Sequence, residues 1–438
     1  MQAGWRKIIL TKVIVEALKV HTSSNTKILS SDLKQPLQQS IPWWSDLDPA
    51  TYAELQLPPV REVAQQPIDV VVVGGGVAGL SAALAIGQHD ASLRVLVLEK
   101  EAMLGFGATG RNAGIFTPGV NMAFSEMQPD NPARSFYPET TAIFHRLILE
   151  AQEQGTLLYA HKNGAINMAT SKRAAYKLER EVQQRTEAGL RAELWTPVQV
   201  VEATRGRLNT RPLINAMWLP DEGRIQPLTL LAHLARRARQ STGVILAGQA
   251  LVTRYEPISS HASAARWQVT LSGGDTANGE NVDGRFTIQA RALVNCVGPV
   301  VGANARIYAL AFAADFPEDF PLFWDASPYT YADYRPGQGR LGVSGGRYGK
   351  AGVTANDAAY YRRLADATRG WVPELAGRRP DYTWAVDLYV GADLLPRLRI
   401  LDEGGAPGIA IEGLGAHGVL PSMVLARQVA AYVVGRLS

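Results

Sequence analysis

The chain has 438 residues, of which 46% are hydrophobic and 41 are glycine, so it can bury a large core and divide into two structural domains. Its formal net charge of +4 comes entirely from residues 1–40, because the remaining residues carry 38 basic and 38 acidic side chains. A nucleic-acid-binding protein needs a basic face on its folded part, and the composition gives no support for that class.

Residues 1–40 contain six basic and two acidic side chains and little apolar periodicity, which predicts a flexible basic extension, with a short amphipathic helix over 5–20 as an option. The apolar run Ile8 to Leu10 is interrupted by Lys12 and Glu16 and lacks a small-residue cleavage site. It predicts neither a signal peptide nor a membrane span, and peripheral contact with anionic lipid is the less favoured alternative. The single cysteine excludes an intramolecular disulfide, which agrees with a cytoplasmic location.

Two adjacent tryptophans, Trp43 and Trp44, precede the first predicted strand. Leaving two indole rings in water is unfavourable, so we expect this segment to pack on the body of the protein. A contact with substrate is the alternative role.

The segment from Asp69 to Lys100 reads as an apolar strand, a glycine turn, a helix of small residues and a second strand ending at Glu99. In a dinucleotide-binding βαβ unit, Gly74 permits the turn, Gly76 lets a pyrophosphate approach the backbone, and Gly79 lets helix and strand pack closely. A carboxylate at Glu99 accepts hydrogen bonds from a ribose 2′-hydroxyl and repels a 2′-phosphate, which leaves NAD or FAD as the cofactor. The cofactor-binding residues predicted here are Gly74, Gly76, Val77, Ala78, Gly79, Glu99 and Lys100.

A glycine-rich segment, LGFGATGRNAGIF, runs from Leu104 to Phe116 without the pattern of an ordinary helix or strand. It resembles the G-(A/S)-(T/S)-G-R-N-x-G stretch of the D-amino-acid oxidase-like FAD-dependent oxidoreductases, which include glycine oxidase, sarcosine oxidase and γ-glutamylputrescine oxidoreductase. The resemblance implies FAD, with this segment running along its pyrophosphate towards the isoalloxazine ring; a glycine-rich surface loop is the alternative. The FAD-binding residues carried over are Gly107, Ala108, Thr109, Gly110, Arg111, Asn112, Ala113 and Gly114.

Three later segments extend the resemblance over most of the chain. Residues 227–256 read as a helix and two strands, residues 292–302 as a strand entering a glycine turn, and residues 408–434 as a strand, a glycine turn and a helix. In the family these contact the adenine and the flavin, and the terminal loop offers backbone amides and a helix N-terminus to the flavin pyrimidine. The FAD-binding residues implied are Val252, Cys296, Gly298, Gly413, Gly415, Ala416, His417, Gly418 and Val419.

The resemblance implies an α/β fold in which an inserted α+β substrate domain, built on an antiparallel sheet, joins a Rossmann-like FAD-binding domain. Residues 41–130, 215–302 and 395–438 are expected to form the discontinuous FAD-binding domain, and residues 131–214 and 303–394 the substrate domain. Within the latter, the charged stretch from Leu178 to Leu194 predicts a solvated helix.

The chemistry that the resemblance implies is oxidation of a C–N bond by hydride transfer to flavin N5, giving an imine that water hydrolyses. No dedicated base is required, and oxygen or another acceptor takes the electrons. The catalytic candidates are Arg111, Asn112 and His417. His417 is expected either to act on the flavin, as a hydrogen-bond donor or a charge, or only to pack.

The substrate side departs from the glycine oxidase pattern. Members of that branch carry an arginine after the tryptophan of a W-A-G-L-R segment and another in the terminal loop, whereas this chain reads Trp384-Ala385-Val386-Asp387-Leu388 and Gly415-Ala416-His417. A buried carboxylate without a bidentate cation is costly, which favours an amine, or an amino compound with a distant carboxylate, over a small amino acid. The substrate candidates are Trp384, Asp387 for a distal ammonium, Arg335 or Arg347 as a relocated anchor, and the pocket-wall tyrosines Tyr329, Tyr331, Tyr348 and Tyr389.

Other reactive residues favour ordinary roles. Cys296 lies in an apolar strand and is expected to be a buried small side chain, and the spacing of the histidines predicts no metal site. Two alternative functions stay open: an amino-acid oxidase or dehydrogenase with a relocated carboxylate anchor, and a flavoprotein with a non-amine or non-catalytic role. A hydroxylase would also need a site for its reductant.

Overall fold

The computed structural model describes residues 41–63, 67–153, 160–258, 266–272, 286–297, 302–325, 330–402 and 405–438. The predicted extension over residues 1–40, its optional helix, Gly298 and Tyr329 lie outside these described residues.

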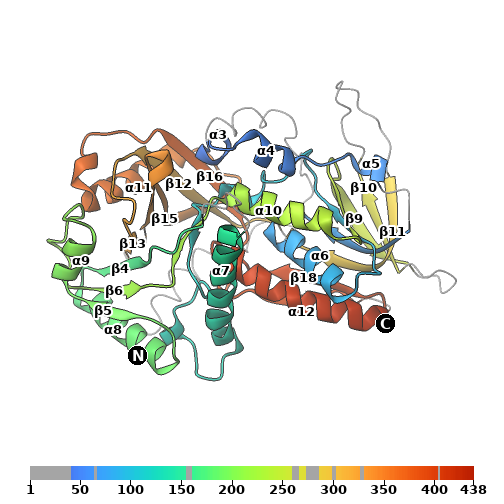
Figure 1. Cartoon of the computed structure of the whole chain (residues 1–438), viewed down its shortest axis with the longest axis horizontal. Coiled ribbons are helices and arrows are strands. Elements are labelled where there is room, and N and C mark those ends of the chain that lie inside the picture. Colours follow the sequence, from blue (N-terminus) through green and yellow to red (C-terminus); the bar gives the residue numbers. More distant parts are fainter. Residues whose placement is uncertain are drawn as a thin grey trace.

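Two eight-stranded sheets lie towards opposite ends of the long axis of the molecule (Figure 1). In the first, the central strand β1 (Ile68–Val73) pairs in parallel with its two neighbours, as a βαβ unit requires. The order along this sheet is β17 (Arg397–Ile400), β18 (Gly408–Glu412), β11 (Phe286–Asn295), β1, β2 (Val95–Leu98) and β8 (Val244–Ala247), with β10 (Trp267–Leu271) and β9 (Val252–Pro257) continuing from β11.

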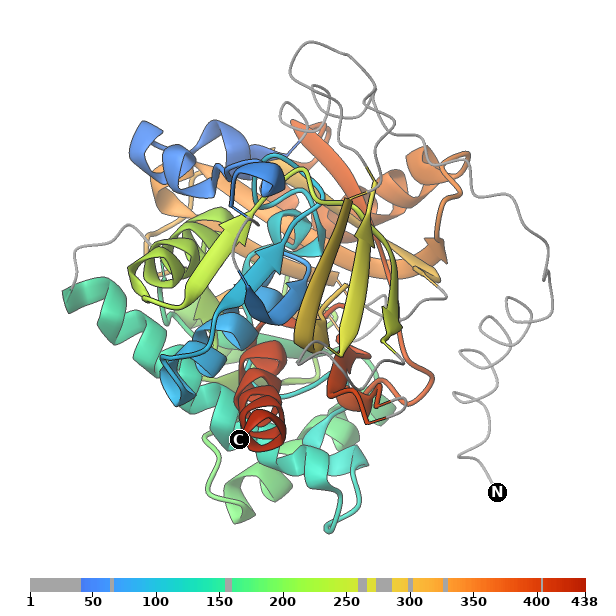
Figure 2. The same ribbon diagram turned by 90° about the vertical axis from the view of Figure 1, so that its right-hand side faces the viewer.

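Both faces of the first sheet are buried, which explains its continuous valine run. Val70 and Val72 pack with one hydrophobic cluster and Val71 and Val73 with another, as the two-residue period of a strand dictates. Helices α6 (Val77–His89), α10 (Pro227–Gln240) and α12 (Val419–Leu437) supply the first cluster, and α12 lies along α6 (Figure 2). Gly79 makes the close approach of α6 possible, because a Cβ there would lie 1.8 Å from the carbonyl oxygen of Gly74.

The second sheet is antiparallel except where β13 pairs in parallel with β4. That pair joins the two separate chain segments from which the sheet is built. Helix α11 (Asp357–Trp371) contributes to the core of this half. The order is β16 (Tyr382–Leu388), β12 (Ala305–Ala313), β15 (Arg340–Lys350), β14 (Thr330–Arg335), β13 (Leu322–Asp325), β4 (Ala165–Ala169), β6 (Asn215–Leu219) and β5 (Glu193–Trp195). A separate pair joins β3 (Ile115–Phe116) to β7 (Gly223–Arg224).

The predicted fold class is confirmed, while the domain boundaries stay a prediction. Strand β6 pairs with β4 and β5 in the second sheet, although residues from 215 onward were expected in the FAD-binding domain. Helix α7 (Phe136–Glu153) packs against α12, on the FAD-binding side, although it was expected in the substrate domain. The two sheets therefore divide the chain at somewhat different residues from those predicted.

The charged stretch from Leu178 to Leu194 forms part of α8 (Lys172–Glu187) and most of β5. The expectation of a solvated helix is wrong at Glu193 and Leu194, which lie in a strand, and at Glu181, which is buried. Its carboxylate accepts hydrogen bonds from the backbone N–H groups of Phe124 and Ser125 and pairs with Arg185 at 2.7 Å, so the charge has partners away from water.

Trp43 and Trp44 are buried, as packing of the segment predicts. They lie in the short helix α3 (Pro42–Ser45), which α4 (Pro49–Leu55) and α5 (Val60–Val63) follow. One further short helix, α9 (Pro197–Ala203), occurs later in the chain. None of the helices in the described ranges is both long and apolar enough to cross a bilayer.

Candidate functional site

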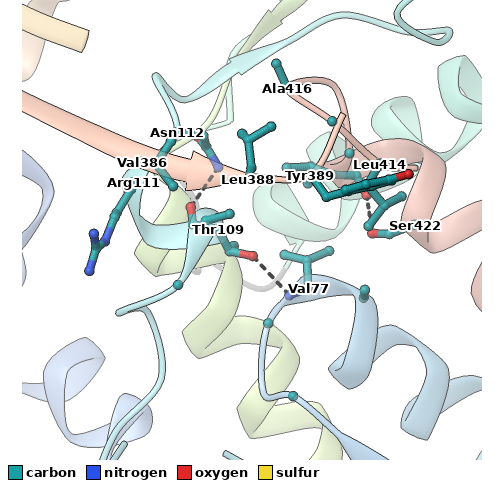
Figure 3. Close-up of a pocket in the computed structure, with 18 of the residues that line it drawn as sticks. Val77, Thr109, Arg111, Asn112, Val386, Leu388, Tyr389, Leu414, Ala416 and Ser422 are labelled. Atoms are coloured by element: carbon teal, nitrogen blue, oxygen red, sulfur yellow. Dashed lines mark hydrogen bonds between the residues drawn. The ribbon is translucent and has the colours of Figure 1, made fainter. Parts of the chain in front are cut away.

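A cavity of about 630 Å³ lies between the carboxyl ends of β1 and β2 and the second sheet. Its wall includes Gly74 and Glu99 from the first sheet and Tyr331 and Asp387 from the second. Figure 3 shows part of this wall, where the glycine turn, the loop around Thr109 and the end of β16 face one another. The carboxyl edge of a parallel sheet is where such folds bind cofactors.

The glycine turn after β1 presents the N-terminus of α6 to the cavity. Gly74 has a φ of +106°, a conformation that side chains disfavour, and Gly76 is the N-cap without any side-chain cap of its own. The N–H of Val77 meets the hydroxyl of Thr109 at 3.3 Å (Figure 3). The backbone amides of the first helical turn and the positive end of the helix dipole make this a site for a pyrophosphate.

Glu99 ends β2 beside this turn. Its carboxylate accepts hydrogen bonds from the N–H of Gly75 at 3.0 Å and the N–H of Glu101 at 3.2 Å, and burial raises its pKa. A carboxylate has more acceptor positions than these two bonds occupy, so it can also accept from sugar hydroxyls. The neighbouring Lys100 also lines the cavity, and its side chain is exposed.

The loop after β2 contains a short 3-10 helix, η1 (Ala108–Arg111). The side chain of Asn112 spans the loop: its amide donates to the carbonyl of Thr109 at 2.7 Å (Figure 3), and its oxygen accepts from the N–H of Gly114, also at 2.7 Å. Asn112 was a catalytic candidate, but its side chain forms these two hydrogen bonds within the loop.

Arg111 lines the cavity, and burial lowers its pKa while the nearby Asp387 acts to raise it. Its guanidinium forms no hydrogen bond or ion pair with another residue in the described part of the chain. The side chain points away from Val77 and Thr109 (Figure 3), so it is not aimed at the pyrophosphate turn.

His417 lies in the loop between β18 and α12, where Gly413 and Gly415 adopt positive φ. Its Nε2 contacts the carbonyl of Thr117, and lies 2.7 Å from the Thr117 hydroxyl. A carbonyl only accepts, so the contact assigns the ring proton to Nε2. Burial lowers the pKa of His417, which keeps the imidazole neutral at pH 7.

The other cofactor candidates divide into residues that line the cavity and residues that support its wall. Cys296 lines it and is only partly buried, although a fully buried side chain was expected; desolvation still raises the pKa of its thiol to about 12, so the sulfur is protonated. Gly110 and Gly114 permit close packing, because a Cβ would lie 1.9 Å from the Gly105 carbonyl oxygen and 1.9 Å from Arg335 Nη2 respectively. Gly107, Ala108, Thr109, Asn112, Ala113, Ala78, Val252, Gly413, Gly415, Ala416, Gly418 and Val419 line the cavity.

The substrate candidates are only partly brought together. Tyr331, Tyr348, Tyr389 and Asp387 line the cavity. Asp387 is paired with Arg306 at 2.9 Å and accepts the N–H of Gly352, so its charge is offset.

Three other substrate candidates lie outside this cavity. Arg335 is buried and donates to backbone carbonyls, Trp384 is buried and donates to the carbonyl of Arg111, and Arg347 lines a separate cavity of about 80 Å³ between β15 and α11. Neither Arg335 nor Arg347 lines the large cavity: Arg335 is bonded to backbone carbonyls, and Arg347 is exposed beside the smaller cavity.

Sequence reasoning missed several wall residues that belong to no motif. Tyr308 and Ser344 come from β12 and β15, and Thr117 and Asn121 follow the glycine-rich loop. Their strand pattern identifies buried and exposed faces but not which face meets the cofactor. Among the described residues, no group of three or more histidine, cysteine or acidic side chains is placed to hold a metal ion.

These features fit FAD. The uncapped N-terminus of α6 suits a pyrophosphate, the Glu99 carboxylate suits a ribose, and the cavity continues past η1 to the second sheet, which leaves room for a ring system.

The comparisons with known proteins agree with FAD as the cofactor. The family model described as "DAO: FAD dependent oxidoreductase" matches residues 69–432. FAD-dependent oxidoreductase domain-containing protein 1 of Bos taurus is 31% identical over 249 residues, which are 55% of this chain and 47% of that protein. The chain thus spans about half the length of this relative.

Two solved structures show the same fold. Glycine oxidase from Geobacillus kaustophilus matches with a TM-score of 0.65 and 21% identity, over 85% of this chain and 95% of that one. Iminodiacetate oxidase from Chelativorans sp. BNC1 matches with a TM-score of 0.62 and 19% identity, over 84% of this chain and 95% of that one.

Proposed function

Because this chain belongs to the family of FAD-dependent oxidoreductases, we propose that it oxidises a C–N bond of an amine or amino compound. FAD, when bound, supplies the acceptor for the hydride that leaves the carbon bearing a neutral amine. The amine nitrogen loses a proton to solvent, and water hydrolyses the resulting imine to a carbonyl compound and ammonia or a smaller amine. Oxygen or another acceptor takes up the two electrons.

The observation that carries this proposal is the charge of the cavity wall. Among the described residues, the lysine and arginine side chains that line it are Lys100, next to Glu99, and Arg111. A small amino acid would bury its carboxylate beside the reacting carbon, which is costly without a bidentate cation there. An amine, or an amino compound with a distant carboxylate, avoids this cost.

Arg111 is the group that we assign to such a distant carboxylate. Its guanidinium has no partner within the described chain, lies near enough to Asp387 for their charges to interact, and points away from the pyrophosphate turn (Figure 3). Arginine binds a carboxylate through two parallel hydrogen bonds, so an unpaired one in a cavity suits an anionic end of the substrate.

The remaining residues shape the cavity and hold its terminal loop in place. Tyr331 and Tyr389 give the second-sheet side of the cavity an aromatic wall. His417, neutral and bonded to Thr117, fixes the terminal loop, whose amides and the N-terminus of α12 can stabilise negative charge on the bound cofactor. No side chain is required as a base, because the substrate reacts as the neutral amine.

The test is anaerobic reduction of the FAD-loaded protein by amines, amino acids and hydroxy acids at equal concentrations, followed by the loss of visible flavin absorbance. We expect amines or amino compounds with distant carboxylates to reduce the flavin, and the product to contain a carbonyl and ammonia or a smaller amine. Reduction by glycine or D-alanine alone would instead support an amino-acid oxidase. Reduction by hydroxy acids alone would support a non-amine role.

A further inference from the structure

Four consecutive backbone carbonyls of the cavity loop each accept a hydrogen bond from a side chain of a distant segment. Trp384 Nε1 donates to the carbonyl of Arg111, and Trp43 Nε1 donates to that of Asn112, both at 2.8 Å. Arg335 Nη2 lies 3.2 Å from the carbonyl oxygen of Ala113 and 3.1 Å from that of Gly114. We call Trp43, Trp384 and Arg335 the carbonyl clamp.

The members of the carbonyl clamp come from different elements and touch one another. Trp43 lies in α3, Trp384 in β16 and Arg335 in β14. The guanidinium of Arg335 stacks 4.3 Å from the ring of Trp43, and the rings of Trp43 and Trp384 meet edge to face at 6.0 Å. All three residues are at most 4% exposed. The clamp is therefore one packed unit, and two of its members belong to the second sheet.

The clamp sets which way the peptide groups of the loop face. In a trans peptide the N–H points opposite to the carbonyl of the preceding residue. Because the carbonyl of Asn112 faces Trp43, the N–H of Ala113 faces the other way. Ala113 lines the cavity, and its N–H has no hydrogen-bond partner among the described residues. The next N–H, of Gly114, is already bonded to the Asn112 side chain.

We propose that the carbonyl clamp is a positioning device that presents the N–H of Ala113 to the bound flavin. A fixed donor that needs no reorganisation stabilises negative charge more effectively than a mobile one. Since reduction adds electrons to the cofactor, the clamp raises its midpoint potential, and it ties that property to the packing of α3 and the second sheet. The proposal rests on FAD binding and not on the choice of substrate.

The arginine of the clamp is the least suitable member for a test. It lies 3.2 Å from Asp333, which is fully buried and also pairs with Arg224. Removing one partner of a buried ion pair strongly destabilises a protein, so an Arg335 variant would report on folding. The two tryptophans each contribute one neutral hydrogen bond and are the better targets.

The experiment compares Trp43→Phe and Trp384→Phe with Trp267→Phe in the full FAD-loaded chain. Trp267 is a matched control because it is equally buried and its Nε1 donates to a carbonyl, that of Pro407, at 2.7 Å, but it does not contact the loop. We measure the flavin midpoint potential, the visible absorption spectrum and the thermal midpoint. We expect each clamp variant to favour the reduced over the oxidised cofactor threefold to tenfold less than wild type does. For a two-electron couple, a tenfold change lowers the midpoint potential by about 30 mV. The control should keep the wild-type potential.

An unchanged potential in both clamp variants would overturn the proposal and leave the tryptophans as ordinary core residues, whatever happens to the thermal midpoint. If a phenylalanine variant does not fold, benzothienylalanine incorporated at position 43 keeps the shape of the indole and removes only the N–H. A lowered midpoint potential in that variant then supports the proposal, and an unchanged potential overturns it. The potential is measured without substrate, so failure of the proposed amine oxidation would not affect this result.

Discussion

Glu99 accepts a hydrogen bond from the backbone N–H of Gly75 at 3.0 Å, which joins the end of β2 to the glycine turn after β1. The two residues end neighbouring strands and are 24 positions apart in sequence, so this bond fixes the ribose end of the site to its pyrophosphate end. A cofactor that bridges both ends depends on their relative position.

Glu99→Gln should therefore weaken FAD binding while leaving the fold intact. The glutamine keeps the size of the side chain but loses the charge and part of the accepting capacity, which is worth roughly 1.5–3 kcal/mol for a hydrogen bond to a charged group. Titration of the apoprotein with FAD, followed by flavin fluorescence, should give a dissociation constant about tenfold or more above wild type. Glu101→Gln is the control, and equal affinity for both variants would contradict the assigned role of Glu99.

Gly76→Val should abolish detectable FAD binding. The backbone at Gly76 has a φ of −73°, which any residue can adopt, so the substitution adds bulk without backbone strain. A Cβ there would already lie 3.2 Å from the Thr109 hydroxyl, and the branched side chain would extend into the space that a pyrophosphate needs. The measurement is the flavin content of the purified protein together with its circular dichroism.

Gly435→Ala is the matched control for this change, because a Cβ at that position meets nothing within 4 Å. We expect it to be yellow, with the wild-type spectrum. A yellow Gly76→Val protein would show that the pyrophosphate lies elsewhere.

The cofactor half could be predicted from the sequence because its signals are local. The strand, the glycines and Glu99 lie within about thirty residues, and the close approach that requires Gly79, to the carbonyl of Gly74, lies within the same unit. The resemblance of the segment from Leu104 to Phe116 then distinguished FAD from NAD.

The second sheet could be predicted only as strands and turns. Arg335 reads as a plausible anchor because its position in the sequence does not reveal that Trp43 and Asp333 enclose it. Likewise, the parallel pairing of β4 and β13 joins segments more than 150 residues apart, and the alternation of apolar residues cannot specify such a register.

Glu222→Gln should stabilise the protein at high pH. Glu222 is buried, its Oε2 has no hydrogen-bond partner among the described residues, and burial raises its pKa well above the ordinary value. The folded state then binds this proton more tightly than the unfolded state does. Stability due to this group is complete below the unfolded pKa of about 4.3 and is lost as the pH rises towards the folded pKa.

The amide cannot ionise, so the variant should exceed wild type in unfolding free energy by at least about 1 kcal/mol at pH 8 and show little difference near pH 4.5. Urea unfolding at both pH values measures this. Glu126→Gln, at a half-exposed side chain paired with Lys177, should show no such pH-dependent gain. A Glu222→Gln protein that is less stable than wild type at pH 8 would mean that the carboxylate is ionised and paired in the native state.

Arg111→Met should separate the substrate classes. Methionine keeps much of the length and apolar stem of arginine but removes the guanidinium, which has no partner in the described chain and whose loss should therefore leave folding and FAD binding unchanged. A bidentate arginine–carboxylate contact in a site shielded from water is worth on the order of 2–5 kcal/mol, so an amino compound that uses Arg111 should lose roughly 30-fold to several thousandfold in the rate of anaerobic flavin reduction at low concentration. A simple amine of similar length, without the carboxylate, should reduce wild type and variant at the same rate.

Arg347→Met is the control. Arg347 lines a separate cavity, so its substitution should leave both rates unchanged. If Arg111→Met slows the simple amine and the carboxylated compound equally, Arg111 acts on the cofactor or the reacting carbon, and the assignment of a distant carboxylate to it is wrong.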